Sequence, residues 1–271
     1  MSMDAIPIWA LFAATIVVLM IAIEAGYRLG HTARRRSEEE KESPVSAISA
    51  AILGLLAFML AFTFGIVYDR YDARKELVRD EANMIRTAWL RSDFVPEPDR
   101  GEAAGLLRKY VDLRLAAAQT RNSDQIQKIL IESVRIQHRL WDMAVVNARK
   151  DMNSDVAALY IESLNELINL HALRVIVGLQ TRLPDGMWLV LYVLVILGMI
   201  GVGYQTAIAG STRRSWVRPI LVLSFSIVIA LIASLDNPKS SFITVPQHPL
   251  VNLQTTMAPG FEARFGIQDK P

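Results

Sequence analysis

The chain has 271 residues, of which 52% are hydrophobic and 21% are charged, and its formal net charge at pH 7 is +2. A charge this close to zero gives no reason to expect nucleic acid as a partner. The sequence contains no cysteine, which excludes disulfides, thiolate catalysis, iron–sulfur clusters and cysteine-ligated zinc.

Four stretches of the chain contain no Asp, Glu, Lys or Arg, namely residues 5–23, 45–67, 187–212 and 219–235. About 20 residues of helix cross the roughly 30 Å hydrocarbon core of a bilayer. The sequence therefore predicts an all-α integral membrane protein with four transmembrane helices and the lipid bilayer as its surroundings. Its parts are two spans with a charged connecting loop (1–68), a helical extramembrane insert (69–186), two further spans (187–235) and an irregular polar tail (236–271).

The first apolar stretch reads as a retained anchor. No positive charge precedes it and no A-x-A-like cleavage site follows it, so it does not resemble a signal peptide. At its end Glu24 and Arg28 are four residues apart, a spacing that lets them pair on a helix at the membrane interface.

Basic residues in the two short loops predict the orientation. Eight of them follow the first span or lie between the third and fourth: Arg28, Arg34, Arg35, Arg36, Lys41, Arg213, Arg214 and Arg218. Short loops rich in Lys and Arg stay in the cytoplasm. The rule places both termini, and with them the insert, on the outer side.

The insert is expected to be helical throughout. The second span continues without Pro or Gly from Tyr68 to Arg91, so its helix should continue too. Beyond the breaker cluster at 96–98, a helix is expected from about Pro98 to Thr120. Two more should begin near Asn122 or Ser123 and near Asn153 or Ser154, because these residue types cap helix N-termini.

A cluster of polar and charged residues follows the second span, comprising Tyr68, Asp69, Arg70, Asp72 and Arg74. Arg70 and Arg74 are like charges at i,i+4, which repel on a helix. One interpretation is a charge belt between subunits, or around a vestibule, just outside the membrane. The other is a solvated helix with i,i+3 pairs from Asp72 to Lys75 and from Glu76 to Arg79.

Small residues recur every four positions in the second span, at Ala57, Ala61 and Gly65, and Gly198 belongs to a glycine-rich stretch of the third. Such residues let helices approach closely in membranes, which makes these four candidates for helix packing. A related line carries Ala47, Ala51 and Leu55, followed by Phe58 and Phe62. These five residues are candidates either for helix contacts or for the lining of a pore.

Motifs for catalysis or cofactor binding are missing. The four histidines are far apart, without acidic or histidine neighbours at ligand spacing, so neither a metal site nor a cofactor is predicted. No nucleophile or phosphate-binding motif occurs, and we do not expect an enzyme. The middle of each span also lacks the ionisable groups that pumps usually need, whereas a passive apolar pore remains allowed.

Several of these residues resemble bacterial bestrophins. The resemblance covers Leu55-Leu56-Ala57-Phe58, the run from Tyr68 to Lys75 (YDRYDARK) and Arg86, and Leu235-Asp236-Asn237-Pro238 is similar to the closing segment of the bestrophin-like family. The order of elements also agrees. The chain departs from the pattern at Phe62-Thr63-Phe64-Gly65, where bestrophins have F-R-T-N. The pore-constricting positions of bestrophins fall on Ala47, Ala51 and Leu55 of this chain. Bestrophins have bulkier apolar residues there.

The resemblance implies a homo-oligomeric channel, a pentamer, in the bacterial inner membrane. It would conduct small anions passively along the second spans. It also implies that the insert lies in the cytoplasm, whereas the basic residues of the short loops place the insert on the outer side. The alternative hypothesis is a non-conducting membrane scaffold or sensor whose helical insert binds another protein.

Overall fold

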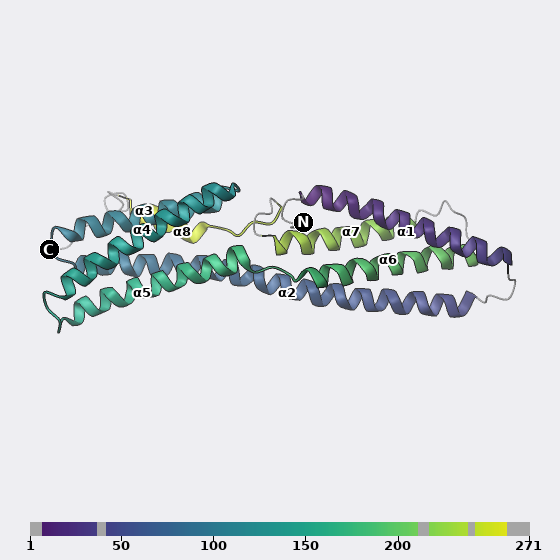
Figure 1. Ribbon diagram of the computed structural model, residues 1–271, viewed down its shortest axis with the longest axis horizontal. Coiled ribbons are helices and arrows are strands. Elements are labelled where there is room, and N and C mark those ends of the chain that lie inside the picture. The colour runs from purple at the N-terminus through teal and green to yellow at the C-terminus, as the bar shows by residue number, and fades with distance from the viewer. Residues whose placement is uncertain (1–6, 37–41, 211–216, 238–241, 259–271) are drawn as a thin grey trace. The chain divides into compact units, whose positions relative to one another are not determined.

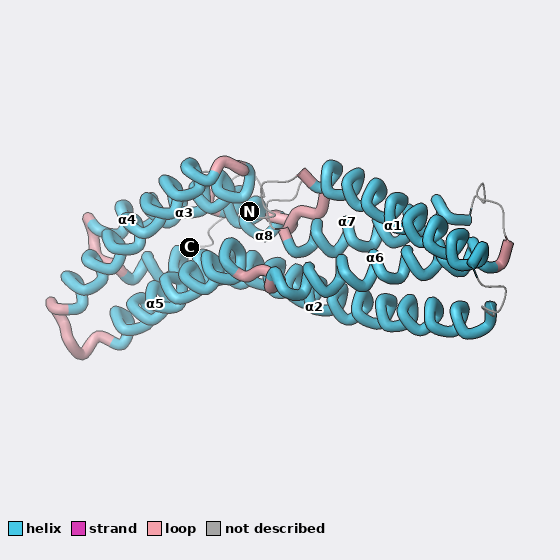
Figure 2. Tube along the Cα trace, turned by 45° about the vertical axis from the view of Figure 1, so that its right-hand side comes forward, coloured by secondary structure: helices cyan, strands magenta, loops and turns pink. Residues whose placement is uncertain are grey.

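The computed structural model describes residues 7–36, 42–210, 217–237 and 242–258, and these residues form helices and loops with no strand among them (Figure 2). The predicted all-α class is confirmed. Figure 1 shows the helices in chain order. They are α1 (Ile8–Arg36), α2 (Glu42–Arg91), α3 (Asp99–Gln119), α4 (Ser123–Ala148), α5 (Asp155–Val175), α6 (Asp185–Ile208), α7 (Val217–Asp236) and α8 (His248–Thr256), with one 3-10 turn, η2 (Ser92–Phe94), and one π turn, η3 (Ile176–Gln180).

Four of these helices, α1, α2, α6 and α7, are long and apolar enough to cross a membrane, which confirms the predicted spans. In the most apolar 18-residue stretch of each of these helices, less than half is buried within the chain. Large apolar surfaces of this kind need lipid or another protein to cover them.

The chain divides into two compact units. The first takes residues 1–71 and 182–244, and the second takes residues 72–181 and those from 245 onward. α2 contributes to both, and it runs unbroken to Arg91 as the absence of Pro and Gly predicted.

In the first unit, α1 and α6 pack very closely. A Cβ atom at Gly26 would overlap the carbonyl group of Ile200, and one at Gly203 would overlap the carbonyl oxygen of Ile23. Glycine is therefore required at this crossing, as in other close membrane helix pairs. The surrounding core is made of apolar side chains, among them Leu19, Leu56, Leu191, Met199 and Ile232.

The second unit has its own core, whose fully buried members include Ile85, Leu107, Leu140, Leu167 and Leu250. Two of its helices begin where capping predicted. The Asn122 side chain accepts from the backbone N–H of Asp124 and Gln125 at the start of α4, and Ser154 accepts from Ala157 at the start of α5.

The tail differs from the expectation of an irregular segment, because it contains α8. Leu250 and Leu253 of this helix are buried in the second unit's core. Gln254 also donates a 2.6 Å hydrogen bond from Nε2 to Oδ1 of Asp112 on α3. Tertiary packing on α3 therefore holds a nine-residue helix that would be marginal by itself.

Candidate functional site

One face of α2 in the first unit is apolar and uncovered. Ala47, Ala51, Leu55, Phe58 and Phe62 follow one another at intervals of three or four residues, which places them on the same side of the helix. All five are exposed, Leu55 at 51%, Phe58 at 66% and Phe62 at 58%. We call these five residues the α2 face. The structure thus brings the pore-lining candidates onto one surface that no described residue covers.

The two phenylalanines are the bulkiest part of the α2 face. Their rings are nearly parallel, with centroids 6.4 Å apart and an interplanar angle of 15°. Residues 44–68 of α2 include no Asp, Glu, Lys or Arg. The face therefore offers apolar bulk and no titratable group.

The small residues of α2 lie beside this face and are also exposed. Ala57, Ala61 and Gly65 are open, and a Cβ atom at Gly65 would have no described atom within 4 Å. Gly198 of α6 differs, since its Cβ would lie 3.1 Å from Cδ2 of Leu53 on α2. Close packing within the subunit is therefore seen at Gly198, whereas the other three positions leave room for a neighbour.

Arg70 is tied to the end of α7. Its Nη1 lies 3.6 Å from Oδ1 of Asp236, and the same carboxylate accepts a 2.9 Å hydrogen bond from the backbone N–H of Leu183. Arg182 donates to the backbone carbonyl of Asp236 at 2.8 Å. Asp236, at the end of α7, thus contacts Arg70 of α2 and the two residues Arg182 and Leu183 just before α6.

The other members of the predicted charge belt differ in exposure. Tyr68, Asp69 and Asp72 are exposed, whereas Arg74 is only 6% exposed. The i,i+3 ion pairs are present, with Asp72 to Lys75 at 3.2 Å and Glu76 to Arg79 at 2.8 Å. The Glu24–Arg28 pair of α1 is also present, at 2.8 Å.

A buried charged cluster in the second unit was missed by sequence reasoning. Glu81 of α2 is fully buried and forms an ion pair with Arg114 on α3, whose Nε lies 2.8 Å from Oε1 of Glu81, and it also pairs with Arg174 at the end of α5. We call these three residues the Glu81 cluster. Burying charges is costly unless they are paired with good geometry. Two cations share one carboxylate here, so loss of Glu81 would leave both buried without it.

Tyr110 and His171 complete the polar interior around the Glu81 cluster. The Tyr110 hydroxyl accepts from Nε2 of Gln137 at 3.2 Å and donates to Oε1 of Glu81 at 3.4 Å, and Nδ1 of His171 lies 2.9 Å away. Burial and the charge of Arg114 lower the pKa of His171 to about 4, so His171 is neutral at pH 7. Burial also lowers the pKa of Arg174 to about 10, which leaves it charged.

A signal for this cluster exists in the sequence. Glu81 lies on the same apolar stripe as Leu77, Val78 and Ile85, all of them buried. A charged residue at a core position of an amphipathic helix must find a partner of opposite charge. The pattern identifies Glu81 as unusual, although it does not identify which cations reach it.

Groups of three or more His, Asp or Glu with metal-binding geometry do not occur among the described residues.

Comparisons with known proteins agree with this architecture. The sequence-family model of the bestrophin-like domain matches residues 9–250 of the chain. The fold is similar to a crystal structure of a bacterial bestrophin homologue from Klebsiella pneumoniae, at 16% identity and a TM-score of 0.62 over 94% of this chain and 97% of that one. The same homologue with an isoleucine-to-threonine substitution matches at 16% identity and 0.61, over 92% and 98%.

A crystallised membrane protein carrying a serine-to-alanine substitution is similar over 97% of this chain and 99% of its own, at 16% identity and a TM-score of 0.62. No curated protein sequence matches the chain. The structural matches show a shared fold, and the family model covers most of the sequence. The chain belongs to the bestrophin-like family.

Proposed function

We propose that this protein is a homo-oligomeric channel, a pentamer, in which the α2 faces of the subunits surround a passive path for small anions. The observation that carries this proposal is the α2 face itself. It is a continuous apolar surface on a membrane-spanning helix, and none of the residues that the structure describes covers it. In an oligomer arranged around α2, this surface would line the axis.

The chemistry of the α2 face favours passive conduction. A path without Asp, Glu, Lys or Arg cannot take up and release protons as pumps and coupled transporters do. Apolar constrictions control flow by dewetting. Leu55, Phe58 and Phe62 would form the narrowest rings, while Ala47 and Ala51 would leave a wider entrance.

Arg70 is the cation of the charge belt that we assign to anion preference. Its charge is shared with Asp236 at 3.6 Å, so its effect on a passing anion is reduced but not removed. The neighbouring Asp69 is exposed and opposes it. We therefore expect moderate selectivity for anions over cations.

The test is flux through purified protein in liposomes, with the oligomeric state measured by native mass spectrometry. A pentamer that passes chloride faster than sodium supports the proposal. An intact oligomer that passes neither ion contradicts it. That second outcome favours the scaffold or sensor hypothesis, in which the helical insert binds a partner protein.

A further inference from the structure

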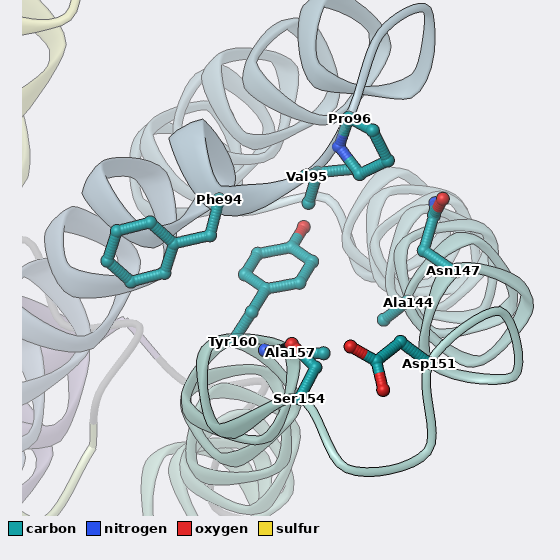
Figure 3. A pocket seen from close by; sticks show the side chains of 9 residues that line it. All are labelled: Phe94, Val95, Pro96, Ala144, Asn147, Asp151, Ser154, Ala157 and Tyr160. Atoms are coloured by element: carbon teal, nitrogen blue, oxygen red, sulfur yellow. Dashed lines mark hydrogen bonds between the residues drawn. The ribbon is translucent and has the colours of Figure 1, made fainter.

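A small cavity opens in the second unit. It lies at the end of the unit's helices, where the turn between α4 and α5 is found. Its volume is about 100 Å³, and three parts of the chain meet there: the segment Phe94–Pro96 after α2, the end of α4, and the start of α5. Figure 3 shows these walls and the side chains on them. None of these residues belongs to the α2 face or to the Glu81 cluster.

The inner wall of the cavity contains a hydroxyl group without a partner. Tyr160 is 2% exposed, and its hydroxyl has no hydrogen-bond partner in the described structure. Its ring rises from α5 and directs the hydroxyl toward Val95 (Figure 3). A buried polar group left unpaired destabilises the folded protein. Because burial raises the pKa of this phenol, the group stays protonated and can both donate and accept.

The outer wall carries a negative charge. Asp151 lies in the turn between α4 and α5, is exposed, and lines the cavity. One of its oxygens, Oδ1, accepts from the backbone N–H of Asn153 at 3.1 Å, so the carboxylate is held in position and retains capacity to accept. The neighbouring Asn147 amide is occupied, because Nδ2 donates to Asp99 at 2.7 Å and Oδ1 accepts from Lys150 at 2.9 Å.

The lining is otherwise mainly apolar, with Val95, Pro96, Ala144 and Ala157. Ser154 also lines the cavity, and its hydroxyl oxygen accepts from the backbone N–H of Ala157 at 3.2 Å. The cavity is thus complementary to a molecule with a hydrogen-bonding group at one end, a short apolar body and a positive charge at the other end. A dry cavity of about 150 Å³ holds a benzene molecule, so this smaller, open one suits a molecule of about five or six non-hydrogen atoms.

We propose that this cavity binds a short amino alcohol, with its hydroxyl group on Tyr160 and its ammonium group on Asp151. The hydroxyl would supply the partner that the phenol lacks. The ammonium would remain near water beside the carboxylate, where an ion pair needs little desolvation. The apolar body would contact Val95 and Ala157.

The experiment uses the full-length protein in detergent and 4-amino-1-butanol as the probe, with binding followed by ligand-detected NMR titration. Tyr160→Phe removes only the unpaired hydroxyl, and Asp151→Asn removes only the charge. Asp142→Asn is the matched control, since Asp142 is an exposed acid of α4 outside the cavity. Thermal unfolding of each variant verifies that it is folded, and Tyr160→Phe should unfold no earlier than the parent.

We expect Tyr160→Phe to weaken binding of 4-amino-1-butanol about tenfold, as for one lost hydrogen bond. Asp151→Asn should weaken it about threefold to tenfold, while Asp142→Asn should have no effect. Butylamine, which lacks the hydroxyl, should respond to Asp151→Asn and not to Tyr160→Phe.

Three results would overturn the proposal. One is the absence of saturable binding to the folded parent protein at tens of millimolar probe. Another is equal binding by the parent, Tyr160→Phe and Asp151→Asn. The third is binding of 4-hydroxybutanoate, which carries the opposite charge, as tightly as the amino alcohol.

Discussion

The side chains of Tyr110 and His171 meet inside the second unit, with the tyrosine hydroxyl 2.9 Å from the histidine Nδ1. The hydroxyl proton is directed at Glu81, so the hydroxyl oxygen is free to accept from an Nδ1–H of neutral His171. This contact links the only histidine with a lowered pKa among the described residues to a buried carboxylate and two arginines.

The stability of the protein should fall between about pH 6.5 and pH 4. The pKa of His171 is about 4 in the folded protein and 6.5 ordinarily, so the unfolded chain binds the proton more tightly. The stabilisation is complete above pH 6.5 and is lost as pH falls toward 4, by up to about 3 kcal/mol. Thermal unfolding across this range should show a weaker pH dependence for His171→Gln than for the parent.

His138→Gln provides the control for this series, because His138 is exposed. Its unfolding temperature should follow the parent at every pH. Equal pH slopes in all three proteins would contradict the assignment to His171.

Glu81→Gln should strongly destabilise the protein. The substitution keeps the shape of the side chain but leaves Arg114 and Arg174 buried without their carboxylate, a loss that typically costs about 3–5 kcal/mol. Chemical unfolding measures it. Glu132→Gln breaks the exposed 2.7 Å pair with Lys109 and should change stability little. A similar denaturant midpoint of unfolding for both variants would show that the Glu81 cluster contributes no more to stability than a surface ion pair.

Gly203→Ala should disrupt the packing of α1 against α6. The added methyl group overlaps the carbonyl oxygen of Ile23, and such overpacking costs about 1–3 kcal/mol. Gly186→Ala tests the same change near the start of α6, where no described atom lies within 4 Å of the new Cβ. The unfolding temperature in detergent should drop for the first variant and not for the second. Equal unfolding temperatures would disprove the close crossing.

Ala51→Phe should lower chloride flux if the α2 face lines a pore, because a ring of added aromatic side chains narrows and dewets the path. Ala14→Phe is the control, since it adds the same bulk at an exposed position of α1. Flux assays with both variants in liposomes, at matched oligomeric state, give the comparison. A flux that falls equally in both, or in neither, would count against pore lining by α2.

The eight basic residues of the short loops predict that the insert lies outside the cytoplasm. Since the chain has no cysteine, Asp124→Cys, at an exposed position in the first turn of α4, would carry the only thiol. An impermeant maleimide should label it in intact cells. Labelling only after lysis would place the insert in the cytoplasm, as the bestrophin resemblance implies.

Local signals in the sequence were sufficient to predict most of the helices. Charge-free stretches identified the spans, and Asn122 and Ser154 cap α4 and α5 as their residue types suggested. α8 was missed because nine residues carry too little periodicity, and its stability comes from burying Leu250 and Leu253. Propensity could not reveal a helix that depends on its neighbours.

The candidate site was predictable only in part. Helical spacing was enough to place Leu55, Phe58 and Phe62 on one side of α2. Spacing could not bring Arg114 and Arg174 to Glu81, since the three residues come from three different helices. The cavity at Tyr160 was equally hidden, because a missing hydrogen-bond partner is a property of the folded chain.

The two compact units are interleaved along the chain, and this has a consequence for biosynthesis. The second unit needs α8, which leaves the ribosome only after α6 and α7 of the first unit. Leu250 is fully buried in the core of that second unit. Translation must therefore deliver all four membrane spans before the helical insert can complete its core. A nonsense codon after Asp236 would leave every span intact and still expose the apolar surface on which α8 packs, a state that invites quality-control proteolysis.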